Sequence, residues 1–453
     1  MTVKGNFQPI TTRRFDTIAL AMSDRRTFLK TASAAGLTTH IFPRLARGAN
    51  DKLQAAFIGM GRMGMGNLSA AMRQENLVPV AVCDVYQPNL DKGFDAAAKN
   101  PHGVTPRKIK DFRQILADKS IDIVCISTPD HWHPYMTVEA CKAGKDVYVE
   151  KPISVTIEEG QLMVKAARKY NRVVQAGTQQ RSQPHYQRLT RMIAEGAIGD
   201  VTFVRTGNYG STPPEGIGAP PDEKPPVDLD WDLWLGPAPA RPYNKNRFGI
   251  DPKSFSHFRW FWDYAGGMMT DWGIHLLDIV QMAYNEVQPT SCVAFGEKFF
   301  IQDNRDTPDT LAATYQYPKF LATYENRLGN GHSPFPYGNT AFHGTKGTLY
   351  CDRSGFKIVP IKDSGIEPLE VVAERGGGNA QHWANFLDCV KTRQRPVSDI
   401  EVCHKSTTTC HLANISIRAK CRVDFDPATE TINPPAARKF ASREHRAPWK
   451  ITL

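Results

Sequence analysis

The sequence predicts an α/β protein, in which a doubly wound parallel sheet is followed by an α+β domain. Three observations lead to this prediction. A strand, a glycine-rich turn, a helix and a second strand follow one another between Leu53 and Asp84. Apolar strand runs and helical patterns then alternate as far as Ala176, which is typical of a parallel sheet with helices on both faces. Beyond this point the alternation ends, so we place domains at 51–177 and 178–453, after a leader at 1–50.

The stretch from Leu53 to Asp84 indicates a dinucleotide site. Residues 53–58 form an apolar strand that runs into a G-x-G-x-x-G turn made of Gly59, Gly61 and Gly64, with Arg62 and Met63 between the last two. The first glycine permits the tight turn, the second lets the backbone approach a pyrophosphate, and the third lets the helix pack closely. The free N–H groups at the start of the helix also favour an anion.

The second strand, 77–83, ends on Asp84, where a carboxylate can bind the ribose hydroxyls of an adenosine. A carboxylate at this position repels a 2′-phosphate, and Val85-Tyr86 offers no arginine in compensation. The sequence therefore favours NAD over NADP.

Later elements of the first domain follow in regular order. We expect helices at about 63–73, 87–100, 111–118, 136–144 and 157–170, and further strands at 121–127, 146–149 and 173–176. Ligands of such sheets bind at the carboxyl ends of the strands, and Gly59, Asp84, Thr128 and Lys151 all fall there.

Four groups of residues together resemble the glucose-fructose oxidoreductase, inositol dehydrogenase and rhizopine-catabolism oxidoreductase family. They are Gly59–Gly64 with Asp84, Ser127-Thr128-Pro129 with His131, Glu150-Lys151-Pro152, and the segment Gly267–His275 that contains Asp271. The resemblance covers nearly everything after the leader. It implies that Lys151 is the catalytic lysine, that Thr128, Pro129, His131 and Glu150 lie at the cofactor, and that the second domain has an open mixed, mainly antiparallel sheet. A homo-oligomer, dimer or tetramer, formed through that sheet is the corresponding expectation.

Residues 174–181 lead out of the first sheet. The resemblance implies that Gln179 lies near the cofactor and Arg181 near the substrate, while a plain helix-capping loop explains them equally well. Residues 210–245 contain nine prolines and four glycines, which fits an ordered arm or lid over a site as well as a solvent loop.

A helix at 267–284 carries Asp271, His275 and Asp278 at spacings of four and three, so we expect all three on one face. Five of the eight tryptophans fall in the short span from Trp231 to Trp272, before and within this helix. Such rings stack on the flat C–H faces of sugars, and they also pack in cores, so sugar contact and core packing stay open. We take Trp262 as a substrate contact. The five are Trp231, Trp234, Trp260, Trp262 and Trp272.

Composition argues against several other classes of function. The formal net charge is +10, but residues 1–50 supply six of these charges, and no Lys/Arg block interleaved with aromatics indicates nucleic-acid binding. Nine cysteines occur without a C-x-x-C pair, which indicates buried thiols rather than a metal site or a disulfide framework. No segment approaches the length of a transmembrane helix.

The leader resembles a twin-arginine export signal. Arg25 and Arg26 precede Phe28-Leu29-Lys30 and a weakly apolar run, Thr31 to Leu37. Since residues 1–21 have no role in such a signal, we expect translation to start at Met22. Export to the periplasm is the interpretation, and a disordered basic tail on a cytoplasmic protein is its alternative.

These features predict a nicotinamide-dependent oxidoreductase that acts on a hydroxyl of a sugar, a cyclic polyol or a glycoside. We expect His275 to transfer the proton with Asp271 as its partner, and Lys151 to stabilise the developing alkoxide, with the His and Lys roles open to exchange. Two alternatives stay open: a redox-neutral glycosidase that oxidises, eliminates and reduces again, and a sugar sensor that keeps a nucleotide as structure.

Replacing Arg25 and Arg26 by Lys should leave the protein in the cytoplasm, because the arginine pair is the part of the signal that the export machinery reads. Fractionation of cells that express the two forms measures this. An unchanged location would remove the leader hypothesis.

Overall fold

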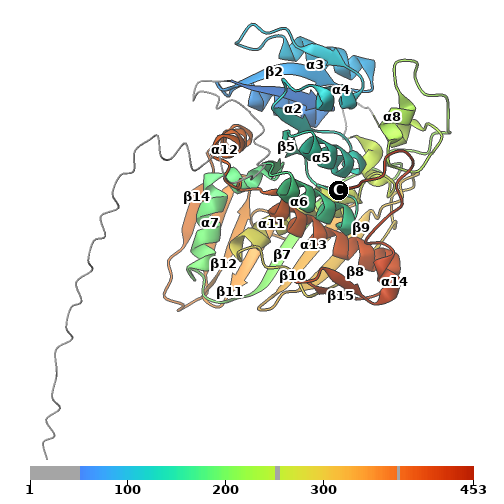
Figure 1. Ribbon diagram of the computed structural model, residues 1–453. Coiled ribbons are helices and arrows are strands. Elements are labelled where there is room, and N and C mark those ends of the chain that lie inside the picture. The colour runs from blue at the N-terminus through green and yellow to red at the C-terminus, as the bar shows by residue number, and fades with distance from the viewer. Residues whose placement is uncertain (1–51, 250–255, 375–377) are drawn as a thin grey trace, which may run out of the picture. The chain divides into compact units, whose positions relative to one another are not determined.

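The computed structural model describes residues 52–249, 256–374 and 378–453. The leader, with Arg25 and Arg26, lies outside the described residues. Two sheets organise the rest of the chain, and Figure 1 shows them one above the other with helices between and around them.

The first sheet has six parallel strands in the order β3-β2-β1-β4-β5-β6. The strand order reverses between β1 and β4, and this is the place where ligands of doubly wound sheets bind. The predicted parallel sheet is confirmed, with one additional short strand, β3, whose charged sequence has no strand pattern. The strands are β1 (Leu53–Ile58), β2 (Leu77–Cys83), β3 (Arg107–Ile109), β4 (Ile123–Ile126), β5 (Asp146–Val149) and β6 (Val174–Ala176).

Helices cover both faces of this sheet. One of them comes from far along the chain: α12 (Asn379–Thr392) places Trp383 against Phe57 of β1 and stacks it on Tyr148 of β5, with ring centroids 4.5 Å apart. The C-terminal part of the chain thus completes the core of the first domain. The other helices are α2 (Arg62–Ala71), α3 (Gln87–Ala97), α4 (Phe112–Ala117), α5 (His133–Lys142) and α6 (Ile157–Lys169).

The second sheet has ten strands in the order β14-β13-β12-β11-β7-β10-β9-β8-β15-β16. Among the described strands of this second sheet, only the β7–β10 pair is parallel, so the predicted mixed, mainly antiparallel sheet is confirmed. The strands are β7 (Val201–Tyr209), β8 (Ser291–Glu297), β9 (Thr310–Gln316), β10 (Leu321–Arg327), β11 (Thr340–Gly344), β12 (Gly347–Asp352), β13 (Gly355–Pro360), β14 (Leu369–Val372), β15 (Val423–Asp426) and β16 (Thr431–Asn433).

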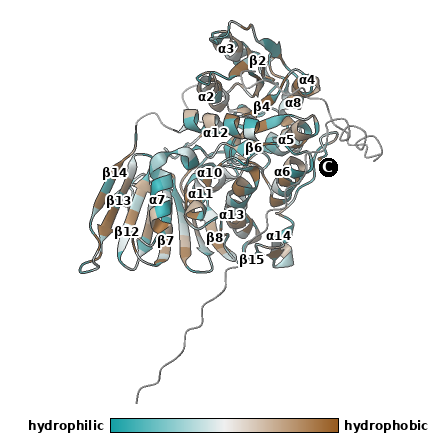
Figure 2. Ribbon diagram, turned by 60° about the vertical axis from the view of Figure 1, so that its left-hand side comes forward, coloured by the Kyte–Doolittle hydropathy of each residue, from teal (hydrophilic) through white to brown (hydrophobic). Residues whose placement is uncertain are grey.

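Three helices, α7 (Pro184–Ala194), α11 (Gly273–Ala283) and α13 (Ile400–Ala419), lie on one face of this sheet (Figure 1). Along β9 buried and exposed residues alternate, so the opposite face is open. Figure 2 shows apolar and polar residues mixed along these strands. Phe295 and Val372 are exposed by 77% and 76%. The homo-oligomer expected through this sheet stays a prediction.

The helix predicted over 267–284 is interrupted. It consists of α10 (Gly267–Asp271) and α11, which are separated at Trp272. The N–H of His275 donates to the carbonyl oxygen of Trp272 at 3.0 Å, whereas the carbonyl oxygen of Asp271 accepts from the Lys151 ammonium at 2.9 Å. The regular helical hydrogen bond from His275 to Asp271 is therefore replaced by a bond to the other domain.

The proline-rich segment forms an ordered arm. It contains α8 (Trp231–Leu235) and α9 (Lys245–Phe248), and it is joined to the loop after β2 by backbone hydrogen bonds from Asp230 to Val85 and from Gln87 to Asp228. The short helix α14 (Pro435–Arg438) and the single turns Asp130–Trp132, Gln179–Ser182 and His257–Trp260 complete the structure. No described helix is long and apolar enough to cross a membrane.

Two glycines of α2 provide a matched test of the turn. A Cβ at Gly64 would lie 1.8 Å from the carbonyl oxygen of Gly59, whereas a Cβ at Gly66 would meet nothing within 4 Å. We expect Gly64→Ala to lower the free energy of unfolding by about 1–3 kcal/mol or more. Gly66→Ala should raise it by up to about 1 kcal/mol, because alanine favours a helix interior. Denaturant titration measures both, and equal effects would contradict the packing described.

Candidate active site

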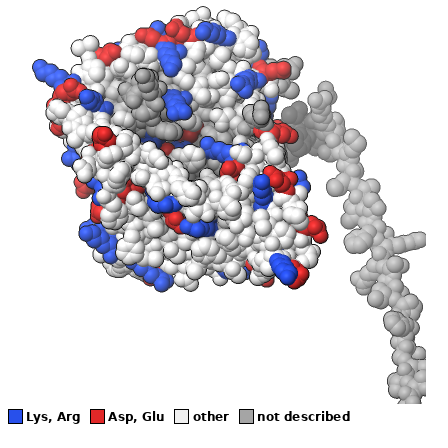
Figure 3. All heavy atoms as spheres, turned by 180° about the vertical axis from the view of Figure 1, so that it is seen from behind, with Lys and Arg blue, Asp and Glu red and all other residues white. Residues whose placement is uncertain are grey.

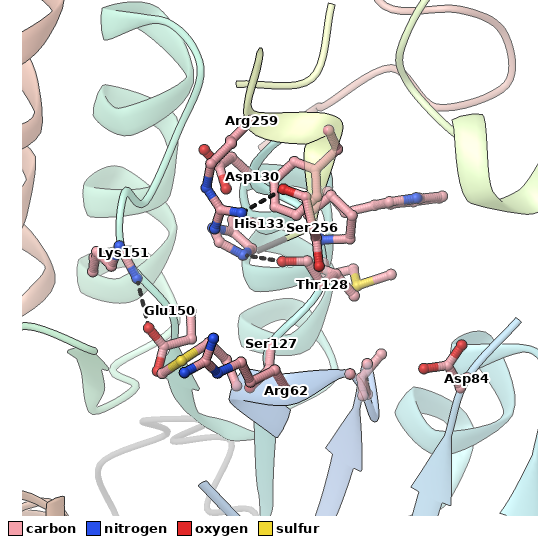
Figure 4. A pocket seen from close by; sticks show the side chains of 18 of the residues that line it. Arg62, Asp84, Ser127, Thr128, Asp130, His133, Glu150, Lys151, Ser256 and Arg259 are labelled. Carbon is pink, nitrogen blue, oxygen red and sulfur yellow. Dashed lines mark hydrogen bonds between the residues drawn. The ribbon is translucent and has the colours of Figure 1, made fainter. Parts of the chain in front are cut away.

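A cavity of about 470 Å³ extends from the carboxyl ends of the first sheet to α10 and α11. Figure 4 shows part of its lining, with Asp84 at one end and Lys151 and Arg259 toward the other. On the side of the molecule seen in Figure 3, charged side chains of both signs lie in and around a groove. Twelve predicted site residues line the cavity: Gly59, Gly61, Arg62, Met63, Asp84, Thr128, Pro129, Glu150, Lys151, Gln179, Asp271 and His275.

The glycine turn has the form that a dinucleotide requires. Gly59 has φ +86°, and a Cβ there would lie 2.7 Å from the carbonyl oxygen of Ser127 on the neighbouring strand end. Gly61 precedes α2 and lines the cavity, and the position of its missing Cβ is open space. A pyrophosphate can thus approach the backbone at the N-terminus of α2. The residues present fit NAD.

Asp84 lies at the end of the cavity that contains the glycine turn. Its carboxylate accepts hydrogen bonds from the N–H groups of Met60 at 2.7 Å and Tyr86 at 2.9 Å. Burial raises the pKa of Asp84 to about 6, although these bonds oppose the shift. The carboxylate is therefore mostly ionised at pH 7 and can accept from ribose hydroxyls.

Polar side chains tie together the loops that follow β4 and β5. His133 lies between two carbonyl oxygens, those of Pro152 at 2.7 Å and Thr128 at 2.9 Å, and burial lowers its pKa to about 4. The bond to Thr128 is visible in Figure 4. Glu150 accepts from the Asn67 amide of α2 at 2.9 Å. The cavity wall is thus held by groups from the loops after β4 and β5 and from the helices α2 and α5.

Lys151 and Asp271 join the two domains inside the cavity. The ammonium donates to the carboxylate Oδ1 of Asp271 at 3.0 Å as well as to its backbone oxygen, and Arg259 Nη2 lies 3.3 Å from the same Oδ1. Burial alone would raise the pKa of Asp271, but Arg259 and Lys151 lower it well below its usual range. Asp271 is ionised, and it binds two cations rather than His275.

His275 and Asp130 are two buried groups that stay neutral. Burial, with Lys151 and Arg353 nearby, lowers the pKa of His275 well below its ordinary value, and no described residue bonds its Nδ1. Burial raises the pKa of Asp130 to about 8, against the effect of Lys151 and Arg259. At pH 7 the cavity therefore presents a neutral imidazole and a largely protonated carboxyl group.

Four predicted site residues lie outside the cavity lining. Gly64 instead allows α2 to pack closely against the carbonyl group of Gly59. His131 is buried with its Nε2 3.0 Å from the carbonyl oxygen of Trp234. Arg181 is 3% exposed and forms ion pairs with Asp278 and Glu286 at 2.8 and 2.7 Å.

Trp262 is the fourth predicted site residue that lies outside the cavity lining, and it is half-buried beneath the Arg418 guanidinium. Asp278, expected on one face with Asp271 and His275, is instead the buried partner of Arg181. Of the five clustered tryptophans only Trp234 and Trp272 line the cavity.

Several lining residues have no signal in the sequence. Asp130, Trp132 and His133 are neighbours of the predicted residue His131 in the sequence. Which of these side chains face the cavity depends on how the single turn Asp130–Trp132 is oriented. Arg259 comes from the single turn His257–Trp260 and Arg353 from the hairpin between β12 and β13, and neither residue belongs to one of the motifs. The described residues hold no cluster of His, Cys, Asp or Glu that could bind a metal ion.

Two models of one family match the chain. The model described as "Oxidoreductase family, NAD-binding Rossmann fold" matches residues 53–178, and the one described as "Oxidoreductase family, C-terminal alpha/beta domain" matches residues 216–451.

Curated relatives align over part of the chain. A "Glycosyl hydrolase family 109 protein" of Shewanella baltica is 32% identical over 160 residues, which are 30% of this chain and 35% of the relative. An "Inositol 2-dehydrogenase" of Salmonella typhimurium is 31% identical over 166 residues, 36% of this chain and 48% of the relative. The matched stretch thus spans between a third and a half of these relatives.

Solved structures share the fold over most of the chain. The WlbA dehydrogenase from Bordetella pertussis, in complex with NADH and UDP-GlcNAcA, is 18% identical with a TM-score of 0.61, and a levoglucosan dehydrogenase in complex with NADH and levoglucosan is 18% identical with a TM-score of 0.63. Each alignment covers 83% of this chain and 99% of the other. The chain belongs to the glucose-fructose oxidoreductase, inositol dehydrogenase and rhizopine-catabolism (Gfo/Idh/MocA) oxidoreductase family, with an NAD-binding Rossmann domain.

Proposed function

We propose that this protein is an NAD-dependent oxidoreductase that acts on a hydroxyl group of a sugar, a cyclic polyol or a glycoside. One observation supports this most directly: a single cavity contains both the glycine turn with Asp84 and the group Lys151, Asp271 and His275. The names of structural neighbours that bind NADH together with a sugar support the same substrate class.

The cofactor residues follow from the cavity. Gly59, Gly61 and the N-terminus of α2 would hold the pyrophosphate, and Asp84 the adenosine ribose. Thr128, Pro129, Glu150 and Gln179 line the wall between the glycine turn and Lys151, where the nicotinamide half would lie. When bound, NAD supplies the hydride acceptor that oxidation of a carbinol requires.

Proton transfer is the task of this chain's own residues. A neutral His275 can accept the hydroxyl proton, and the Lys151 ammonium can stabilise the developing alkoxide. Because Asp271 binds Lys151 and Arg259, we assign it the positioning of Lys151 rather than of His275. Lys151 and Arg353 both oppose a positive charge on His275, so the exchange of the His and Lys roles stays open.

A redox-neutral glycosidase is the second candidate, favoured by the relative named for glycosyl hydrolase family 109. The arm also favours it, because Leu233, Trp234 and Phe248 line the cavity from a segment bonded to the loop after Asp84. A cofactor covered in this way would be retained and regenerated within the site.

A screen of sugars and aryl glycosides against the purified protein separates the candidates. A net change in nicotinamide absorbance supports the dehydrogenase, and release of the aglycone without a net change supports the glycosidase. If no compound gives an absorbance change or releases an aglycone, and the protein still retains its nucleotide, the result would favour a sugar sensor and contradict the proposal.

Asp84→Ala should weaken NAD binding by about one to two orders of magnitude, as expected for the loss of charge-assisted hydrogen bonds to the ribose. With the native residue, affinity should fall as the pH decreases through about 6, since protonation removes the acceptor. The variant should lack this pH dependence. Calorimetric titration with NAD and NADP measures both effects, and a preference for NADP in the native protein would contradict the role of Asp84.

Lys151→Ala and His275→Ala should each lower kcat by about 10²–10⁴ with little effect on NAD affinity, because neither residue contacts the adenosine half. Asp271→Asn should have a milder effect, since the Asp271 backbone oxygen still binds Lys151. If His275 is the base, kcat/KM should not decline until the pH is well below 6.5.

Steady-state kinetics and NAD titration measure these effects. Lys346→Ala and His343→Ala serve as matched controls, because neither residue lines the cavity. Near-normal turnover in both the Lys151 and the His275 variant would refute the mechanism.

A further inference from the structure

Positive charge exceeds negative charge at the end of the cavity that would hold the substrate. Lys151, Arg259 and Arg353 line this end, and Asp271 forms ion pairs with the first two. Asp130 is nearby, but burial keeps most of it protonated at pH 7. Even with Glu150, which lines the cavity beside Lys151, three cations therefore face at most two ionised carboxylates. Since charge in a cleft is costly unless it is paired, this end favours an anion.

Arg353 is the cation without a carboxylate partner. It lies in the turn between β12 and β13, and no ion pair joins it to another described residue. By contrast, Arg259 and Lys151 share Oδ1 of Asp271.

Hydrogen bonding and stacking fix the orientation of this guanidinium. Nε donates to Oε1 of Gln180 at 3.1 Å, and the group lies 4.9 Å from the ring centroid of Trp272. With Nε engaged and one face on the indole, the two terminal nitrogens have no hydrogen-bond acceptor among the described residues. They form the planar edge that binds a carboxylate through two parallel bonds.

The same contacts place Arg353 close to His275. Gln180 Nε2 donates to the carbonyl oxygen of His275 at 3.2 Å, and the His275 ring lies 5.9 Å from the Trp272 ring. Arg353 and His275 thus share both Gln180 and Trp272 as neighbours. An anionic group bound by Arg353 would belong to the same sugar unit as the hydroxyl at His275.

We propose that the substrate is an acidic sugar of the uronic acid class, whose carboxylate is bound by the Arg353 guanidinium while its ring hydroxyl lies at His275 and Lys151. This inference rests on the proposed function, and it deepens it by naming the substrate class. Arg353 acts in specificity: it selects the substrate and takes no part in proton or hydride transfer.

Matched pairs of sugars test the inference. We would measure NAD reduction and calorimetric binding by the NAD-loaded protein with glucose and glucuronate, with galactose and galacturonate, and with glucose 6-phosphate. The expected preference in kcat/KM for each uronate over its neutral sugar is about tenfold to a hundredfold. Arg353→Gln should reduce this ratio to near one, mainly by raising KM for the uronate.

Arg327→Gln is the matched control. Arg327 also stacks on an aromatic ring, that of Tyr209 at 4.5 Å, and lies on the same sheet but away from the cavity. Its substitution should leave the uronate preference unchanged. Arg353→Lys should restore only part of the preference, because an ammonium lacks the planar pair of donors.

The outcomes distinguish this inference from the proposed function. Three results would overturn the uronate assignment but would still leave an oxidoreductase. The protein could turn over neutral sugars with equal or better kcat/KM than the uronates, or it could prefer glucose 6-phosphate. Arg353→Gln could also lower kcat/KM equally for the uronate and for its neutral sugar. Uronate binding that depends on Arg353 without any NAD reduction would support the anion site and contradict the oxidoreductase.

Discussion

The hydrogen bonds between Lys151 and Asp271 determine how the two sheets meet in the cavity. The ammonium binds both the carboxylate and the backbone oxygen of Asp271, at 3.0 and 2.9 Å. Because that oxygen bonds to Lys151, the N–H of His275 bonds to Trp272 and the helix is interrupted there. The interruption places His275 in the first turn of α11, facing the cavity. One contact between domains thus positions all three candidate catalytic groups.

The contact between Lys151 and Asp271 also contributes to the protonation states of Asp271 and His275. Asp271 stays ionised because it lies against two cations, and its single negative charge neutralises only one of them. His275 stays neutral since burial and the neighbouring Lys151 and Arg353 oppose its protonation. A hydroxyl group therefore meets an unprotonated base and an ammonium together, and the remaining positive charge is available to the rest of the substrate.

Local pattern predicted the first sheet and the cofactor half of the cavity, because strand, glycine turn and terminal acid are adjacent in the sequence. It did not predict contacts that depend on distant segments. Arg181 was expected at the substrate, but its buried partner Asp278 lies 97 positions away. Arg353 reaches the cavity from a hairpin whose sequence is that of an ordinary turn. His131 and His133 differ only in which side of a single turn they occupy, and periodicity does not determine this for so short an element.

Isotope transfer tests the central claim, that one cavity brings a carbinol to both the nicotinamide and the groups around Lys151. The NAD-loaded protein would be mixed with a screened substrate that carries deuterium at the oxidised carbon, and the nucleotide would then be released and analysed by mass spectrometry. The dehydrogenase predicts deuterium that stays on the nicotinamide ring, whereas the redox-neutral mechanism predicts deuterium there only until the reduction step returns it to the product, so the reaction is quenched rapidly during the first turnover. Lys151→Ala should reduce the rate at which the label appears on the ring. Turnover in which the nucleotide carries no deuterium at any time during the first turnover would contradict the account.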